Sequence, residues 1–327
     1  MKNIKVGVIG VGYLGRFHAQ KYAALENVTL VGIADLDKQQ GQKVAGECDC
    51  RFFADYQELI PLVDAVSIAV PTSYHCQVAG ECLDQGLDVL LEKPMTVTLE
   101  EADELIAKAA ARNLTLQIGH LERFNPAFMA MEPFLTTPVF IESNRIATFK
   151  NRGVDVDVVL DLMIHDIDII LNIVKSPIKT IHTVGAPVVT ANTDIANARL
   201  IFENGATANI TVSRISRTNV RKMRIFQPGS YINVDFGNKR VMTIKLSDEL
   251  RENGVPKQEV KLQTFSDGDA LKNEIISFMQ HVRERTKPAV AGAEGRRALA
   301  VALQVMEQNK ELYKLDLFKM LLDSKKS

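Results

Sequence analysis

Apolar residues form short uninterrupted runs through the first third of the chain, and amphipathic stretches separate these runs. The runs lie at 5–9, 28–34, 64–70, 88–92 and 114–118, with a weaker one at 51–53. The stretches with helical spacing lie at 12–25, 37–46, 74–85 and 98–112. Apolar strands without alternation are covered on both faces, so this succession predicts an α/β domain with a parallel sheet. Right-handed crossovers then give a doubly wound fold over residues 1–120.

The pattern changes after residue 120. One short helix is expected at 123–133, a long strand at 139–149 and an amphipathic helix at 158–174. Strands and turns follow from 178 to 246, and helices return at 270–286 and 294–313. A run of strands with few helices predicts an α+β second domain over 121–327, with a mostly antiparallel open sheet.

Composition narrows the classes of function. The 327 residues are 46% hydrophobic and carry a formal net charge of -1, so no global basic field favours nucleic acid or an anionic membrane. No apolar stretch approaches the roughly 18 residues of a membrane span, and the N-terminus lacks the regions of a signal peptide. The cysteines at 48, 50, 76 and 82 suit neither a zinc ribbon nor a disulfide scaffold. We therefore expect a cytoplasmic protein with reduced thiols and no metal.

A glycine motif follows the first predicted strand and opens a helix. Gly10 permits a tight turn, Gly12 lets the backbone approach a pyrophosphate, and Gly15 lets helix and strand pack closely. The helix N-terminus favours the anion through its free N–H groups and dipole. The motif, with Tyr13 and Leu14 between its glycines, predicts a Rossmann dinucleotide-binding site.

An acidic residue ends the second predicted strand. Asp35 lies twenty residues after Gly15, where a carboxylate accepts hydrogen bonds from a ribose 2′-hydroxyl and repels a 2′-phosphate. This position favours NAD over NADP as the cofactor. Because Lys38 lies nearby and is cationic, the sequence does not exclude NADP as the cofactor.

Three further motifs carry a resemblance to a known family. They are Val70-Pro71-Thr72 with His75, Leu91-Glu92-Lys93-Pro94, and the segment from Asp161 to Asp168 that contains His165. In combination they resemble the glucose-fructose oxidoreductase / inositol dehydrogenase (Gfo/Idh/MocA) family, over nearly the whole chain. The resemblance implies hydride transfer between a sugar hydroxyl and NAD, and a homodimer or homotetramer. It also implies that Lys93, Asp161 and His165 are catalytic, that Pro71, Thr72, His75 and Glu92 lie at the cofactor, and that the Lys93-Pro94 bond is cis or strained.

Placement of these residues agrees with such roles. Lys93 directly follows the fifth predicted strand, on the rim where doubly wound sheets bind ligands. Asp161, His165 and Asp168 lie at i, i+4 and i+7 and share one helix face. A structural polar network and a metal site are the alternatives for that face. Either His165 or Lys93 takes the hydroxyl proton, and histidine is favoured because it titrates near neutral pH. His75 is equally well explained as a satisfied histidine at a helix start.

The substrate prediction rests on the resemblance as well. Members with a similar segment around His120 and Arg123 act on nucleotide-linked sugars, which implies oxidation of the 3-hydroxyl of UDP-N-acetylglucosamine. Asn144 and Arg152, just before the catalytic helix, are candidates for sugar hydroxyls. The alternatives are a free polyol or aldose dehydrogenase, an NAD-dependent glycosidase and a nucleotide-binding sensor without turnover.

Overall fold

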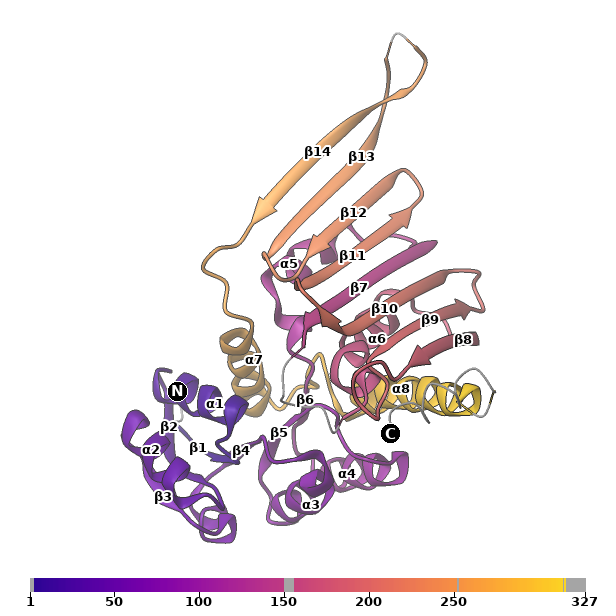
Figure 1. Cartoon of the computed structure of the whole chain (residues 1–327). Helices are drawn as coiled ribbons and strands as arrows, with labels where there is room; N and C mark the ends of the chain where they lie inside the picture. Colours follow the sequence, from indigo (N-terminus) through magenta and orange to yellow (C-terminus); the bar gives the residue numbers. More distant parts are fainter. Residues whose placement is uncertain (1–2, 150–155, 252, 314, 316–327) are drawn as a thin grey trace. The chain divides into compact units, whose positions relative to one another are not determined.

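The computed structural model describes residues 3–149, 156–251, 253–313 and 315. The chain divides into two compact units (Figure 1). The first contains Met1–Leu121 and Asp269–Leu299, and the second contains Glu122–Gly268 and the residues from Ala300 on. The predicted boundary after residue 120 assigned everything downstream to one domain. The segment 269–299 instead packs with the first unit.

The sheet of the first unit has six parallel strands in the order β3-β2-β1-β4-β5-β6. Their bounds are β1 Ile4–Ile9, β2 Val28–Ala34, β3 Arg51–Phe53, β4 Ala65–Ile68, β5 Asp88–Glu92 and β6 Leu116–Gly119. The predicted doubly wound fold is confirmed, weak third strand included. The strand order reverses between β1 and β4, and such a reversal opens a ligand crevice at the carboxyl ends of the strands.

Helices pack on both faces of this sheet because the crossovers run in opposite directions from β1. The α-helices are α1 Tyr13–Ala23, α2 Lys38–Cys48, α3 His75–Asp84, α4 Leu99–Ala111, α7 Ala270–Glu284 and the first part of α8 Gly292–Leu312. Short 3-10 turns are η1 Tyr56–Glu58, η2 Ile60–Leu62 and η3 Thr72–Tyr74. Helix α7 lies beside α1 (Figure 1). Its Phe278 and Met279 are buried in one apolar cluster with Val8 and Tyr22, so a late segment completes the first core.

Two glycines of helix α2 offer a matched pair of substitutions. A Cβ at Gly46 would meet nothing within 4 Å, whereas a Cβ at Gly41 would lie 2.2 Å from Phe52 Cε2. Gly46→Ala is expected to raise the free energy of unfolding by about 0.5–1 kcal/mol, because alanine loses less backbone entropy in a helix. Gly41→Ala is expected to lower it. Urea unfolding of both variants checks the pair, and a destabilised Gly46→Ala would contradict the open environment.

The second unit contains an eight-stranded sheet in the order β14-β13-β12-β11-β7-β10-β9-β8. The strands are β7 Phe140–Thr148, β8 Ile178–Ala186, β9 Ile195–Phe202, β10 Thr207–Ser216, β11 Val220–Gln227, β12 Ser230–Asp235, β13 Arg240–Leu250 and β14 Pro256–Thr264. Strands β7 and β10 pair in parallel and all other described pairs are antiparallel. The mostly antiparallel sheet is thus confirmed, and Asn204-Gly205 forms the predicted turn between β9 and β10, with Gly205 at φ 87.

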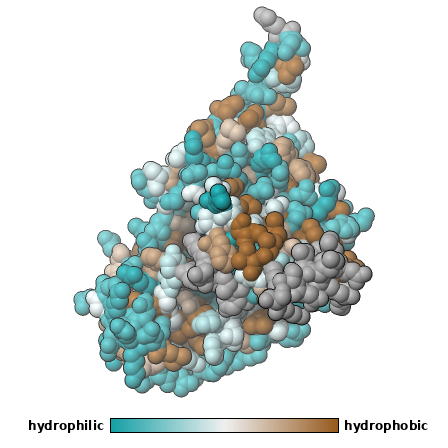
Figure 2. All heavy atoms as spheres, in the orientation of Figure 1, coloured by the Kyte–Doolittle hydropathy of each residue, from teal (hydrophilic) through white to brown (hydrophobic). Residues whose placement is uncertain are grey.

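Alternate residues of these strands are buried on one face of the sheet. Ile141, Ala208 and Ile225 are cross-strand neighbours and are at most 1% exposed, whereas their sequence neighbours are more exposed. Helix α6 Ile164–Ile173 covers β7 on this face. The other face carries no described helix against its central strands, as expected for an open sheet. At the edge of the sheet, β13 and β14 extend past the neighbouring strands, and Figure 2 shows hydrophilic and hydrophobic side chains mixed along this ribbon.

Two predicted helices of the second unit differ in detail. The segment 123–133 is not one helix: Leu121–Phe124 (η4) and Glu132–Phe134 (η5) are 3-10 turns around the short α5 Pro126–Met131. Asn125 caps α5 by accepting from the Ala127 N–H, so the chain restarts there. The predicted helix at 158–174 begins as a π-helix, η6 Val159–Met163, before it continues as α6. No helix in the described part of the chain is long and apolar enough to cross a membrane.

Candidate functional site

The glycine loop between β1 and α1 has the geometry of a phosphate-binding turn. Gly10 adopts φ 81, and a Cβ there would lie 2.9 Å from the backbone of Ala69. A Cβ at Gly15 would lie only 1.8 Å from the Gly10 carbonyl oxygen, so helix and strand are in close contact. A Cβ at Gly12 would meet nothing within 4 Å. The middle glycine therefore faces open space at the N-terminus of α1, where a pyrophosphate fits.

Asp35 braces this loop. Its carboxylate accepts from the Val11 N–H at 2.6 Å and from the Asp37 N–H at 2.8 Å. Each carboxylate oxygen has further lone pairs, so the group can still accept from a ribose hydroxyl. Beside it, Tyr13 is 63% exposed and Leu14 38% exposed. The residues present therefore fit a dinucleotide.

Lys93 directly follows β5, in a turn that is held in place by contacts with His75. The Lys93-Pro94 peptide is cis, as predicted. His75 places Nδ1 2.9 Å from the Pro94 carbonyl oxygen and Nε2 2.9 Å from the Val70 carbonyl oxygen. Burial keeps the pKa of His75 below its ordinary value, although these carbonyls favour the charged form. Both ring nitrogens thus face main-chain atoms, so His75 links the loop after β4, which carries Pro71 and Thr72, to the lysine turn.

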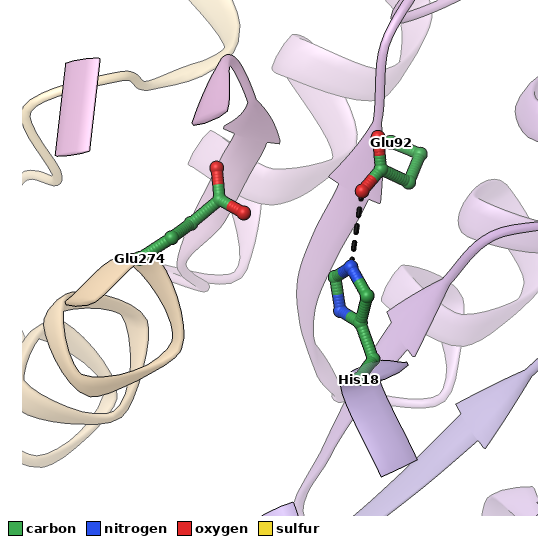
Figure 3. Close-up of side chains that lie close together, drawn as sticks. All are labelled: His18, Glu92 and Glu274. Carbon is green, nitrogen blue, oxygen red and sulfur yellow. Dashed lines mark hydrogen bonds and ion pairs between the residues drawn. The ribbon is translucent and has the colours of Figure 1, made fainter. Parts of the chain in front are cut away.

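Glu92 precedes the lysine and is buried. Its carboxylate lies 3.0 Å from His18 Nε2 of α1 and accepts from the Lys93 N–H at 3.2 Å (Figure 3). Burial opposes ionisation, but the hydrogen bond and charge of His18 outweigh it, so the pKa of Glu92 lies below its ordinary value. The structure therefore places Glu92 within the unit, against His18, where it holds the backbone of the lysine turn.

In the second unit, Asp161 lies in η6 and His165 in the first turn of α6, and both are half-buried. Four residues make close to one full turn in both α- and π-helices, so the two side chains stay on the same side of the segment. The predicted third member of this face, Asp168, is 3% exposed and lies 3.5 Å from Arg123. Asp168 and Arg123 thus form a buried ion pair, and the Arg123 guanidinium also stacks over Phe128 at 5.5 Å.

A second buried ion network ties β7 to α6. Arg145 donates from Nε to Asp166 at 2.8 Å and from Nη1 to Glu122 at 2.8 Å. Burial works against the charge, but Asp166 and Glu122 keep the pKa of Arg145 above its ordinary value. The Arg145 side chain is 4% exposed, so its positive charge lies in the interior together with the carboxylates of Asp166 and Glu122. This network fixes the helix that carries His165.

The predicted substrate residues are dispersed. Asn144 neighbours Arg145 on β7, so strand alternation places it on the face opposite α6, next to Thr211 and Lys222. The structure does not bring Asn144 to His165. His120 belongs to the first unit and is 1% exposed. Arg152 lies outside the described residues.

Sequence reasoning missed the buried polar groups that support these residues. His18, Glu122 and Glu274 are all buried and were not assigned a role. Glu274 had a readable signal, because it falls on the apolar face of α7 beside Ile275 and Phe278, where an acid is costly. His18 follows Gly15 by three residues, but only the fold shows that it faces Glu92.

Comparisons with known proteins agree with this geometry. The family model described as "Oxidoreductase family, NAD-binding Rossmann fold" matches residues 4–120, and the model described as "GFO/IDH/MocA C-terminal domain" matches residues 140–227. UDP-N-acetylglucosamine 3-dehydrogenase of Acidithiobacillus ferrooxidans is 40% identical over 306 residues, which cover 93% of this chain and 97% of that protein. Its solved structure superposes with a TM-score of 0.87 at 39% identity, over 94% of this chain and 98% of that one.

More distant relatives match this chain over most of its length. Myo-inositol 2-dehydrogenase of Thermotoga maritima is 25% identical over 316 residues, 90% of this chain and 93% of that protein. Levoglucosan dehydrogenase, solved with NADH and L-sorbose, has a TM-score of 0.85 at 16% identity over 95% of this chain and 98% of that one, a likeness of fold alone. Two family models match the chain and one relative is 40% identical to it, and together these findings establish its family. The chain belongs to the Gfo/Idh/MocA family of NAD-binding oxidoreductases.

Proposed function

We propose that this protein oxidises the 3-hydroxyl of UDP-N-acetylglucosamine with NAD. The observation that carries the proposal is the 40% identity to the Acidithiobacillus ferrooxidans enzyme across 93% of the chain. The chain also carries the proposed catalytic residues: Lys93 follows a strand, and Asp161 and His165 lie on one helical segment. A sensor without turnover would need neither a lysine turn nor a histidine–aspartate pair.

The cofactor is held by the first unit in this proposal. Gly10, Gly12 and the N-terminus of α1 hold the pyrophosphate, and Asp35 accepts from the adenosine ribose. Pro71 and Thr72 follow β4 on the other side of the strand-order reversal, where the nicotinamide end of the cofactor is expected. When bound, NAD supplies the two-electron acceptor.

The remaining roles belong to side chains of the protein. The Lys93 ammonium donates a hydrogen bond to the sugar oxygen and stabilises the negative charge that develops there. His165 accepts the hydroxyl proton, and Asp161 orients the imidazole and stabilises its charged form. His75 and Glu92 act on the turn that carries Lys93, rather than on the substrate.

Substrate recognition is proposed in a narrower form than the sequence suggested. Arg123 is engaged by Asp168, so it is not assigned to the diphosphate. His120 and Arg152 remain candidates for substrate contact. Arg221 and Lys222 have side chains 57% and 53% exposed and form long ion pairs with Glu122 and Asp235, at 3.9 and 3.6 Å; both are proposed as cations for an anionic ligand.

We also propose a homodimer or homotetramer in the cytoplasm. The open sheet face carries Phe140, Phe226 and Tyr231 in mutual contact, with ring centroids 5.7 and 5.0 Å apart. Aromatic residues on an otherwise polar face are typical of interfaces. The four cysteines are unpaired, as in proteins of reducing compartments.

NADH absorbance separates the candidate substrates. We expect turnover with UDP-N-acetylglucosamine and little with myo-inositol or free N-acetylglucosamine. The second candidate, a polyol dehydrogenase, is favoured by the 25% identity to the Thermotoga maritima enzyme. Turnover with myo-inositol alone would support it and remove the sugar-nucleotide proposal. Reduction of NADP at a rate equal to that of NAD would remove the role of Asp35.

A further inference from the structure

We propose that Glu274 is a neutral carboxylic acid in the folded protein, buried beside the ionised Glu92 carboxylate. The pair, with His18, then acts as a buried clamp that holds the strand end carrying Lys93. The clamp is defined here as His18, Glu92 and Glu274. Its effect on catalysis rests on the proposed role of Lys93, whereas its protonation does not.

The three side chains come from distant parts of the sequence and meet inside the first unit. His18 lies on α1, Glu92 ends β5, and Glu274 lies on α7. One ligand atom from each lies within 4.8 Å of the others, and Figure 3 shows the Glu274 carboxylate directed toward the His18–Glu92 pair. Glu274 is 0% exposed and His18 1% exposed. Water does not reach the acid from the surface.

Glu274 has no compensation for a negative charge. Neither of its carboxylate oxygens has a hydrogen-bond partner among the described residues. The groups facing it are His18 and Tyr22 from α1 and Glu92 from β5, while the amide of Gln117 from β6 donates to the Glu274 main-chain carbonyl and not to the carboxylate. His18 already bonds to Glu92 through Nε2, and the Tyr22 hydroxyl bonds to Ser67. An isolated buried carboxylate is so costly that such a group takes up a proton instead.

The two acids are not equivalent, which decides where the proton resides. Glu92 is stabilised as an anion by His18 and by the Lys93 N–H. Glu274 has neither contact. Burial and the neighbouring Glu92 charge accordingly raise the pKa of Glu274 well above its ordinary value. Two close carboxyl groups that share one proton are a known arrangement in interiors.

The clamp connects directly to the lysine turn. Glu92 Oε2 accepts from the Lys93 N–H, and Gly119 on β6 packs so closely that a Cβ there would lie 3.0 Å from Glu92 Oε2. A second negative charge on Glu274 would repel this carboxylate, so the neutral acid leaves Glu92 in place to accept from the Lys93 N–H. Glu274 is therefore a positioning residue, since it acts on Lys93 through Glu92.

A divalent cation is the competing occupant, because imidazole and carboxylate oxygens are also metal ligands. The proton is favoured because His18 Nε2 already lies at hydrogen-bonding distance from Glu92, at 3.0 Å.

The test compares Glu274→Gln with the wild type and with Glu284→Gln, an exposed acid on the same helix. Glutamine imitates the neutral acid and cannot ionise. A glutamate whose folded pKa is raised destabilises the fold as pH rises above its unfolded value, 4.5, until its folded pKa is reached. The folding constant of the wild type should therefore fall, relative to Glu274→Gln, by up to about tenfold per pH unit across that window.

We expect Glu274→Gln to match the wild type near pH 4.5 and to have a higher Tm at pH 8, whereas Glu284→Gln should track the wild type throughout. Infrared difference spectra should show a neutral carboxyl band in the wild type that Glu274→Gln removes. A pH-independent difference with no such band would overturn the proposal. So would one equivalent of metal in the wild type that is lost in Glu274→Gln.

Kinetics then test the positioning role. Glu274→Gln should retain most of the wild-type kcat, and Glu274→Leu, which replaces the polar head group beside Glu92 with a branched apolar one, should lose about tenfold or more in kcat with a nearly unchanged KM for NAD. Equal kcat in the glutamine and leucine variants would contradict the effect on Lys93. If no variant turns over any sugar while the infrared band and the pH slope persist, the proposed function fails and the buried acid stands.

Discussion

Lys93→Met is expected to lower kcat by about 10²–10⁴-fold, the range that a positioned proton donor or charge stabiliser contributes. Methionine has a similar length and no charge, so the half-buried position is filled while the ammonium is lost. The glycine loop and Asp35 are untouched, so the affinity for NAD should change little. Initial rates of NADH formation with UDP-N-acetylglucosamine, together with calorimetry of NAD binding, measure both effects.

Two comparisons make this result specific. Lys43→Met removes an exposed lysine of the same unit, from helix α2, and should leave kcat and KM unchanged. His165→Asn should abolish the rise of kcat/KM with pH that a histidine base produces, while Lys93→Met should keep that rise at a lower level. A Lys93→Met enzyme with kcat within a few fold of the wild type would exclude Lys93 from the chemistry.

Arg145→Met is expected to lower the free energy of unfolding by about 3–5 kcal/mol, because it breaks a buried ion network from one side. Asp166 and Glu122 would both remain in the interior, and the one cation that bonds to both would be gone. Their desolvation is then only partly offset, because Glu122 still accepts from Asn125 and lies 3.9 Å from Arg221 but both carboxylates lose their buried cation. Urea unfolding at neutral pH, followed by circular dichroism, measures the change.

The matched control lies on the next strand. Arg224 of β11 pairs with Glu142 of β7, but its side chain is 45% exposed. Arg224→Met should cost about 0–1 kcal/mol, as exposed ion pairs do. Similar costs for the two variants would mean that the Arg145 network is solvated, contrary to its burial.

Much of the fold could be predicted from the sequence because local signals and tertiary structure agree there. The apolar runs of the first unit are strands that must be covered on both faces, and no other element fits them. The glycine spacing also fixed the turn after β1. The boundary after residue 120 was less accurate, since an amphipathic helix such as α7 shows which face is buried but not which core receives it.

The site was predictable only where a motif is local. The lysine turn and the Asp161–His165 spacing are each contained in one segment. Arg123, by contrast, was predicted to be available to a ligand, and the structure pairs it with Asp168 across 45 positions of sequence. Asn144 was predicted as a candidate for sugar hydroxyls, and strand alternation from Arg145 places it on the face opposite α6. Partners of long side chains depend on the tertiary fold, which one sequence does not encode in any short pattern.

The return of residues 269–299 to the first unit has a consequence for biosynthesis. One side of this core is filled by Ile275, Phe278, Met279 and Val282. The other buried residues of the core lie between Ile4 and Leu90 in the sequence. A nascent chain that has just released its first 120 residues from the ribosome therefore exposes an unfinished apolar surface. That surface stays open while the second unit is being translated. Chaperone capture should be strongest in this interval, and ribosome-stalled chains ending before residue 269 should be far more protease-sensitive than chains that extend past residue 299.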